Sequence, residues 1–164
     1  MERKFKAVMP ISAYPFHLGH VSLFVQAESV FGKGKVLILV CNNSNKDYSA
    51  YDRMAFFRFE PDTFPAELCE GLVADFCNEH KIKFIVRGCR TYLDWNYEKE
   101  ISDFNDMFNL QTIFFPAIRR VAHISSSKIR ELLKYDKMNE AIEMCPRGVG
   151  PYLYSLKAAL RKEN

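Results

Sequence analysis

Apolar segments alternate with helical patterns along this chain, and this alternation limits the folds that it can adopt. Residues 5–9, 36–41, 84–86 and 112–115 form short apolar runs, which are typical of strands buried on both faces. A first helix is expected to end at Gly32. Further helices are expected at residues 51–59, 72–80, 96–108 and 127–135. The alternation predicts an α/β fold, a Rossmann-like doubly wound parallel sheet of about five strands with helices on both faces.

Two parts of the chain fit the alternation less well. Pro61 and Pro65 interrupt residues 60–70, where we expect a loop or a short edge element. The end of the chain predicts a helical C-terminal tail, with helices at residues 138–144 and 152–161 separated by prolines and glycines. We expect residues 1–164 to form a single domain, because 164 residues with 48% hydrophobic residues suffice for one core and are few for two.

Composition excludes several classes of partner. The net charge is +3 and the basic residues are scattered, so we expect no nucleic-acid partner. No apolar stretch approaches the roughly 20 residues of a membrane span, and the first residues lack the apolar core of a secretory signal. We therefore expect a cytoplasmic protein. The five cysteines contain no Cys-x-x-Cys pair, which favours buried thiols over a disulfide framework or a zinc site.

A pair of histidines follows the first expected strand. His17 and His20 stand on either side of Leu-Gly at the expected start of the first helix. The first N–H groups of a helix are unpaired and lie at the positive end of its dipole, so phosphate binds there readily. Two imidazoles add donors, and Gly19 lets a ligand approach the backbone. The pattern predicts a phosphate site, with a chance pair of histidines as the alternative.

Basic side chains follow two more of the expected strands, at the edge where ligands of open parallel sheets bind. Lys46 ends a polar loop and can supply a point charge for phosphate, although a solvated lysine is the alternative. Arg87 and Arg90 flank Gly-Cys, and Gly88 lets the chain turn so that both guanidinium groups converge on a phosphate. The alternative for the arginines is a surface ion-pair cluster with the acidic residues that follow, Asp94, Glu98 or Glu100.

Three serines in succession, Ser125, Ser126 and Ser127, precede the helix expected at residues 127–135. One serine is expected to cap the helix, and the other hydroxyls with the open N–H groups predict a second anion site. A plain helix cap is the alternative. No Walker loop, Gly-x-Ser-x-Gly or Gly-x-Gly-x-x-Gly is present. Anchored phosphates without a nucleophile favour nucleotidyl transfer, in which positioning and charge neutralisation carry most of the catalysis.

Together these motifs resemble those of the bacterial phosphopantetheine adenylyltransferases, within the cytidylyltransferase-like superfamily of nucleotidyltransferases. Residues 10–20 are similar to the family's Pro-Gly-Ser/Thr-Phe-Asp-Pro-x-His-x-Gly-His, and residues 71–76 to its Gly-Leu-x-Val-Asp-Tyr/Phe helix. Residues 87–105 resemble its Arg-Gly-Leu-Arg-x3-Asp-x2-Tyr-Glu-x6-Asn, and residues 124–130 its Ile-Ser-Ser-Ser-x-x-Arg/Lys. Lys46 with Arg53 resembles the family's lysine loop and following helix. The resemblance covers nearly the whole chain.

The resemblance implies transfer of AMP from ATP to 4′-phosphopantetheine, giving dephospho-coenzyme A and pyrophosphate, with Mg²⁺ present and no covalent enzyme intermediate. It also implies a homo-oligomer, a hexamer in the family. Carried over position by position, the catalytic residues are His20, His17, Lys46 and Arg90. The implied acceptor-binding residues are Ser12, Lys46, Ala74 and Arg87. The implied ATP-binding residues are Ser12, Ala13, His20, Gly88, Arg90, Glu98, Ser125, Ser126 and Ser127.

The chain departs from the family's pattern beside the histidines. Ile11 replaces a glycine, Ala13 a phenylalanine and Tyr14 an aspartate, and Asn43 stands where the family often has proline. A β-branched residue at a glycine position narrows the approach of a ligand, and it is strained if the backbone needs a positive φ. Two alternatives therefore stay open: a relative that uses ATP on another phosphorylated acceptor, and a non-catalytic nucleotide-binding module.

Overall fold

Five parallel strands form the centre of the protein. A computed structural model describes residues 4–45, 48–58 and 63–162, so Lys46 lies outside the described residues. The strands are β1 (Ala7–Ile11), β2 (Val36–Cys41), β3 (Ala66–Cys69), β4 (Phe84–Cys89) and β5 (Gln111–Pro116). Their order in the sheet is β3-β2-β1-β4-β5, and every neighbouring pair is parallel. The predicted α/β fold with a parallel sheet is confirmed.

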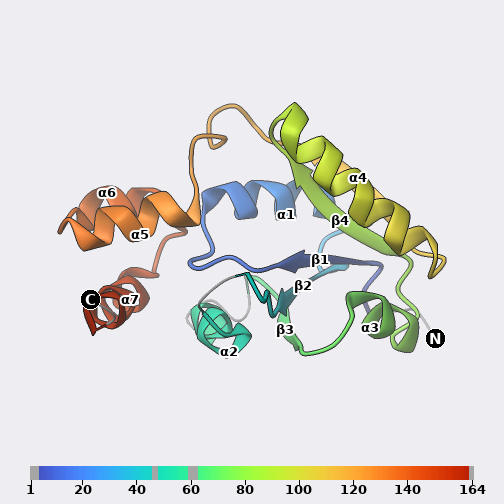
Figure 1. Ribbon diagram of the computed structural model, residues 1–164, viewed down its shortest axis with the longest axis horizontal. Coiled ribbons are helices and arrows are strands. Elements are labelled where there is room, and N and C mark those ends of the chain that lie inside the picture. Colours follow the sequence, from blue (N-terminus) through green and yellow to red (C-terminus); the bar gives the residue numbers. More distant parts are fainter. Residues whose placement is uncertain (1–3, 46–47, 59–62, 163–164) are drawn as a thin grey trace.

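The strand order reverses between β1 and β4. The chain runs outward from β1 through β2 to β3, crosses back over β1 to β4, and continues outward to β5. The crevice outside the carboxyl ends of β1 and β4 is the switch point at which such sheets bind ligands. Beyond this edge Figure 1 shows the C-terminal helices α5 (Ser126–Lys134), α6 (Met138–Glu143) and α7 (Gly150–Lys162).

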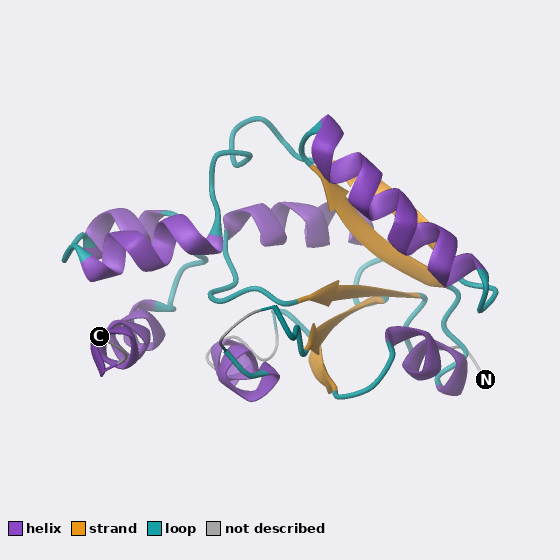
Figure 2. Cartoon of the chain, viewed as in Figure 1, coloured by secondary structure: helices purple, strands orange, loops and turns teal. Residues whose placement is uncertain are grey.

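Helices cover both faces of the sheet (Figure 2). One core cluster combines β1, β2 and β4 with α1 (Leu18–Phe31), α2 (Ala50–Met54), the 3-10 helix η1 (Ala55–Arg58) and the C-terminal helices. Alternate strand residues such as Val8, Leu37 and Ile85 form the second cluster, with α3 (Val73–Glu79) on the opposite face. On that face α4 (Tyr92–Asp106) also packs, and Asn105 donates a hydrogen bond to Thr112 of β5. The side-chain period of two in strands explains this division.

The structure corrects several expected boundaries. β4 runs on to Cys89 and α4 begins at Tyr92, ahead of residue 96, because Thr91 and Asp94 form a capping box. In contrast, the short strand β3, at the sheet edge directly after Pro65, confirms the short edge element expected within residues 60–70 as the alternative to a loop. Helix α7 begins at Gly150, earlier than residue 152, and Pro151 fits its first turn because the first N–H groups of a helix need no carbonyl partner.

Two smaller expectations can also be compared with the structure. Helix α1 ends at Gly32, which has a φ of 104°, as its sequence predicts. Cys69, Cys77 and Cys145 are buried, whereas Cys41 and Cys89 are only partly covered. Burial raises the pKa of the Cys77 thiol to about 12, so this group is protonated near neutral pH. Among the described residues, the helices are too short or too polar to cross a membrane.

Candidate active site

Two histidine rings lie against each other at the start of α1. His17 is the N-cap, and its Nδ1 accepts a hydrogen bond from the Gly19 N–H at 3.1 Å. His20 Nδ1 accepts from the His17 N–H at 3.2 Å, and the two ring centroids are 3.8 Å apart. A nitrogen that accepts a hydrogen bond carries no proton, so these partners assign the proton of each neutral ring to Nε2. The motif therefore brings two N–H donors together at the switch point.

His17 is held neutral. It is 6% exposed, and burial together with the nearby charge of Arg90 lowers its pKa to about 4. Desolvation disfavours the charged imidazolium, and a like charge adds to that effect. His17 thus acts as a neutral hydrogen-bond donor beside Arg90, which reaches the same region from the end of β4.

The predicted role of the α1 backbone is wrong. Its first N–H groups are already satisfied: Leu18 donates to the Met144 carbonyl at 2.9 Å, and His20 donates to the His17 carbonyl at 2.8 Å. The Gly19 N–H is taken by His17 Nδ1. Anion contacts at this helix start must come from the imidazoles. Gly19 itself makes room for its neighbour, because a Cβ there would lie 2.8 Å from His17 Cε1.

The start of α5 has the open donors that α1 lacks. Ser125 is the N-cap and accepts from the Lys128 N–H at 3.2 Å, as expected for one of the serines. Ser126 donates its hydroxyl to the Pro15 carbonyl at 2.8 Å, which ties α5 to the histidine loop. Within the described part of the chain, the N–H groups of Ser126 and Ser127 have no acceptor. This helix start is the better backbone site for a phosphate.

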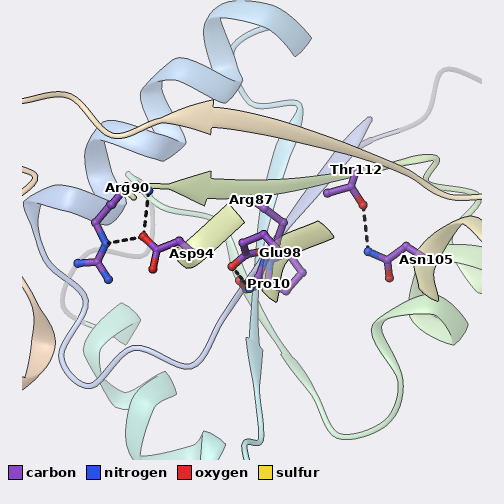
Figure 3. A network of polar contacts seen from close by, with 7 residues as sticks. All are labelled: Pro10, Arg87, Arg90, Asp94, Glu98, Asn105 and Thr112. Carbon is purple, nitrogen blue, oxygen red and sulfur yellow. Dashed lines mark hydrogen bonds and ion pairs between the residues drawn. The ribbon is translucent and has the colours of Figure 1, made fainter. Parts of the chain in front are cut away.

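The two arginines, Arg87 in β4 and Arg90 just after it, do not converge as predicted. Arg87 makes a bidentate ion pair with Glu98 of α4, with Nε–Oε2 at 2.6 Å and Nη2–Oε1 at 2.8 Å (Figure 3). Arg90 lies beside Asp94, which accepts from the Arg90 N–H at 3.1 Å. These contacts fit the alternative stated above, ion pairs with the acidic residues that follow. The pair of Arg87 with Glu98 differs from that alternative in being largely buried, not on the surface.

Gly88 also differs from its predicted role. It lies within β4 and makes no turn. A Cβ at this position would be 3.2 Å from Leu23 Cδ2, so the glycine permits close packing of α1 on the sheet. Arg87 lies in β4 and pairs with Glu98, whereas Arg90 lies just beyond its end and pairs with Asp94, so the two guanidinium groups have different partners.

One side of the crevice is built around the ends of β1 and β2. Asn43 Nδ2 donates to Ser12 Oγ at 3.3 Å, and the Asn43 Oδ1 accepts from the Asn45 N–H at 3.0 Å. Ile11 ends β1 and is not among the described non-glycine residues with positive φ, so it is unstrained there. Ala13 is buried at 7% exposure, and Ala74 at 2% packs in the α3 core cluster, so neither side chain is open to solvent.

Tyr14 joins this side of the crevice to the C-terminal helices. Its ring lies 4.1 Å from that of Tyr48, centroid to centroid. Arg130 of α5 donates to the Tyr14 carbonyl at 2.5 Å and places its guanidinium over the Tyr48 ring, 5.6 Å from the centroid. The residue that replaces the family's aspartate is thus part of an aromatic and cationic cluster.

Arg90 also borders an aromatic cavity of about 420 Å³ at the ends of β4 and β5. Its walls include Trp95 and Phe114, whose ring centroids are 5.0 Å apart. Flat aromatic walls of this kind suit a planar ring.

Comparisons with known proteins agree with this geometry. Residues 13–132 match the cytidylyltransferase-like family. The phosphopantetheine adenylyltransferase of Cytophaga hutchinsonii is 33% identical over 138 residues, which cover 79% of this chain and 90% of that protein. That of Cutibacterium acnes is 35% identical over 129 residues, covering 76% and 82%. This chain belongs to the phosphopantetheine adenylyltransferase family.

A solved structure shows the same fold at greater distance. Thermotoga maritima TmcAL bound with alpha-thio ATP aligns with a TM-score of 0.57 and 11% identity, over 97% of this chain and 56% of that one. At this identity the likeness concerns the fold alone.

The burial of Arg53 could have been predicted from helical spacing. Ala50 and Arg53 are the buried positions of α2, three apart, and Arg53 is 1% exposed. Its Nη1 donates to the Cys41 carbonyl at 3.0 Å, whereas Nε and Nη2 have no hydrogen-bond partner among the described residues. Arg53 thereby fixes α2 against the end of β2. The contacts of Asn43 and Arg130 carry no comparable signal, because their partners are remote in sequence.

The described residues do not form a metal site. No group of three or more histidine, cysteine or acidic side chains among them could hold a metal ion. The carboxylates at the crevice are already used, Glu98 by Arg87 and Asp94 by the α4 cap. Protein-held Mg²⁺ normally requires one or two carboxylates together with phosphates. The chain does not fit that requirement in its described part.

Proposed function

We propose that this chain transfers AMP from ATP to 4′-phosphopantetheine, giving dephospho-coenzyme A and pyrophosphate. The observation that carries the proposal is the cluster of His17 and His20 with Arg90 at the switch point, together with the open N–H groups at the start of α5, which Ser126 ties to the histidine loop. Such donors neutralise charge on a phosphate without forming a covalent bond. The names of the bacterial relatives supply the acceptor.

In this proposal the reaction is a direct displacement. A phosphate oxygen of the acceptor attacks the α-phosphorus of ATP, the new P–O bond forms, and the bond to the β-phosphate oxygen breaks with its electron pair going to pyrophosphate. Negative charge grows on the α-phosphate oxygens, to which the Nε2–H of His20 donates, with His17 beside it. Arg90 and the start of α5 hold the remaining phosphates, and the cavity beside Arg90 suits the adenine ring.

The acceptor side completes the assignment. Ser12, Lys46 and Arg87 hold the acceptor phosphate in this proposal, and Asn43 fixes Ser12. Mg²⁺ accompanies ATP as its counter-ion without a ligand from the described residues, and no step is derived through it.

The decisive experiment measures pyrophosphate release with ATP and a panel of phosphorylated acceptors. Release with 4′-phosphopantetheine alone supports the proposal. Release only with another acceptor supports the second candidate, which the buried Tyr14, stacked with Tyr48, favours because it replaces a carboxylate of the family. Trp95 is the only tryptophan, so its fluorescence can report ATP binding directly. ATP binding without any release identifies a non-catalytic nucleotide-binding module.

The His20→Ala variant tests the catalytic role. Removal of a donor that acts mainly in the transition state is expected to lower kcat by about 100-fold or more while KM for ATP changes little. His80→Ala is the matched control, since His80 is exposed at the C-cap of α3 and stacks on Phe76. A large rise in KM for ATP with unchanged kcat contradicts the role.

The proposal includes assembly into a homo-oligomer, a hexamer as the resemblance implies, and a cytoplasmic location, because the reaction consumes ATP. Helix α4 and its C-cap expose large apolar side chains that suit subunit contacts: Tyr92, Leu93 and Tyr97 of the helix and the C-cap Met107 are 78%, 79%, 62% and 77% exposed. Light scattering on the purified protein measures the mass, and a monomer at micromolar concentration contradicts this part.

A further inference from the structure

The ring of Phe16 is stacked against the ring of His20. Phe16 directly precedes the N-cap His17, and the ring centroids of Phe16 and His20 are 5.2 Å apart, with an angle of 19° between the planes. An apolar residue just before an N-cap commonly packs on the first turn of the helix that follows. Phe16 is 1% exposed, whereas His20 is half-buried. The phenyl ring is thus a buried surface on which a partly exposed imidazole lies.

Phe16 is itself held in place by an aromatic cluster. Its ring centroid lies 5.3 Å from that of Phe56, 5.2 Å from that of Phe57 and 5.3 Å from that of Phe64. Tilted and edge-to-face contacts of this kind add stabilisation beyond the area that they bury. Helix α5 also donates hydrogen bonds to the carbonyls of the two residues before Phe16. The phenyl ring therefore has a fixed position from which to orient its neighbour.

The side chain of His20 needs such a surface. Rotation about χ2 of a histidine is broad and roughly two-fold, so the ring is poorly oriented by its own torsions. The hydrogen bond from the His17 N–H to His20 Nδ1 favours one orientation, but at 3.2 Å it is at the long end of the usual range. Stacking on Phe16 restricts the plane of the ring, which one long hydrogen bond leaves free to tilt.

We propose that Phe16 is a positioning residue for His20: its ring fixes the plane of the imidazole, so that the Nε2–H points at the α-phosphate oxygens of ATP before the reaction begins. This inference rests on the proposed function, because it takes His20 as the donor that acts in the transition state. Phe16 itself touches neither substrate. A donor that is oriented in advance needs no reorganisation during the reaction, so its loss appears in kcat.

Steady-state kinetics of Phe16→Leu test this role. Leucine keeps the position apolar but has no flat face. We expect kcat to fall by about tenfold and KM for ATP to stay within about twofold, since a displacement of about 1 Å in a catalytic group can cost about 100-fold. Phe24→Leu is the matched control, because Phe24 is 2% exposed on the same helix as His20 and its ring packs edge-on against Phe64. An equal fall of kcat in both variants overturns the proposal.

A double-variant cycle separates positioning from a general loosening of the core. If Phe16 acts only through the imidazole, Phe16→Leu should change kcat little in a His20→Ala background. A fall of the same size in both backgrounds overturns the proposal, and so does a selective rise in KM for ATP. Melting temperatures identify any variant that fails to fold. In that case Phe16→Met, whose flexible side chain fills more of the space, carries the comparison.

Nitrogen NMR of the His20 ring gives a readout that does not depend on turnover. Above neutral pH the wild type and Phe24→Leu should show one neutral tautomer with the proton on Nε2, whereas Phe16→Leu should show a mixture, because a ring that turns loses its hydrogen bond at Nδ1. If the wild type releases no pyrophosphate, the proposed function fails and these signals decide the inference by themselves. The same single tautomer in the wild type and in Phe16→Leu overturns it.

Discussion

At the scale of single residues, hydrogen-bond partners determine the chemistry of the site. His17 accepts from Gly19 and His20 accepts from His17, so both rings present the same nitrogen as donor. Arg87 is committed to Glu98, and its remaining donors define what it can bind. The identity of a side chain gives only its range of roles, and its partner selects one of them.

The buried neutral His17 predicts a pH dependence of stability. Its pKa is about 4 in the folded chain against 6.5 in the unfolded one, so below pH 6.5 protons bind the unfolded chain preferentially. Stability from this residue is fully present above pH 6.5 and is lost as the pH falls toward 4. Urea unfolding at pH 8 and pH 5 should show a loss of about 2 kcal/mol from His17.

The His17→Asn variant is the control for this measurement. Asparagine is a good N-cap and does not titrate. The variant should therefore lose less stability between the two pH values than the wild type, by about 2 kcal/mol. An equal pH dependence in both proteins shows that the imidazole is not held neutral.

At the scale of elements, capping decides where the helices of the site begin. Thr91 Oγ1 accepts from the Asp94 N–H at 3.2 Å, and Asp94 in return accepts from the Thr91 N–H at 3.1 Å. This box starts α4 directly after β4 and so sets the position of Glu98 in its second turn. Among the residues that the structure describes, the first N–H groups of α5 are free, whereas those of α1 are already hydrogen-bonded. The free N–H donors therefore decide which of the two helices can hold an anion.

Removal of the α4 cap should destabilise the protein measurably. Thr91→Ala loses the hydroxyl that caps the helix, and we expect the free energy of unfolding to fall by about 1 kcal/mol. Thr91→Ser retains the hydroxyl and should stay close to the wild type in the same denaturant titration. If the serine variant is as unstable as the alanine variant, the hydroxyl is not the stabilising group.

At the scale of the whole molecule, the C-terminal helices are part of the site's framework. Met144 closes the start of α1, Ser126 contacts the histidine loop, and Arg130 holds Tyr14. Asp136, after α5, pairs with Lys157 at 2.5 Å and with Arg161 at 2.6 Å, both on α7. The tail shares a core cluster with the sheet, so we expect the two to unfold as one cooperative unit.

A core substitution in α7 tests this unity. Leu153 is 0% exposed, so Leu153→Ala should lower the free energy of unfolding by about 2–5 kcal/mol and keep a single transition. Tyr154→Ala, at a neighbouring position that is 62% exposed, should change it by about 0.5 kcal/mol or less. Two separate transitions, with the sheet unaffected by Leu153→Ala, contradict a single unit.

The sequence by itself determined the alternation of strands and helices, the parallel sheet, and the placing of the histidine, arginine and serine motifs at one edge. These follow from burial periodicity and from the common direction of parallel strands, which are local properties. Only the tertiary structure decided that Met144 closes the start of α1, that Glu98 takes Arg87, and that Arg130 binds the loop at Tyr14. Each of these depends on which groups far apart in the chain meet on packing, and a one-dimensional pattern does not contain that information.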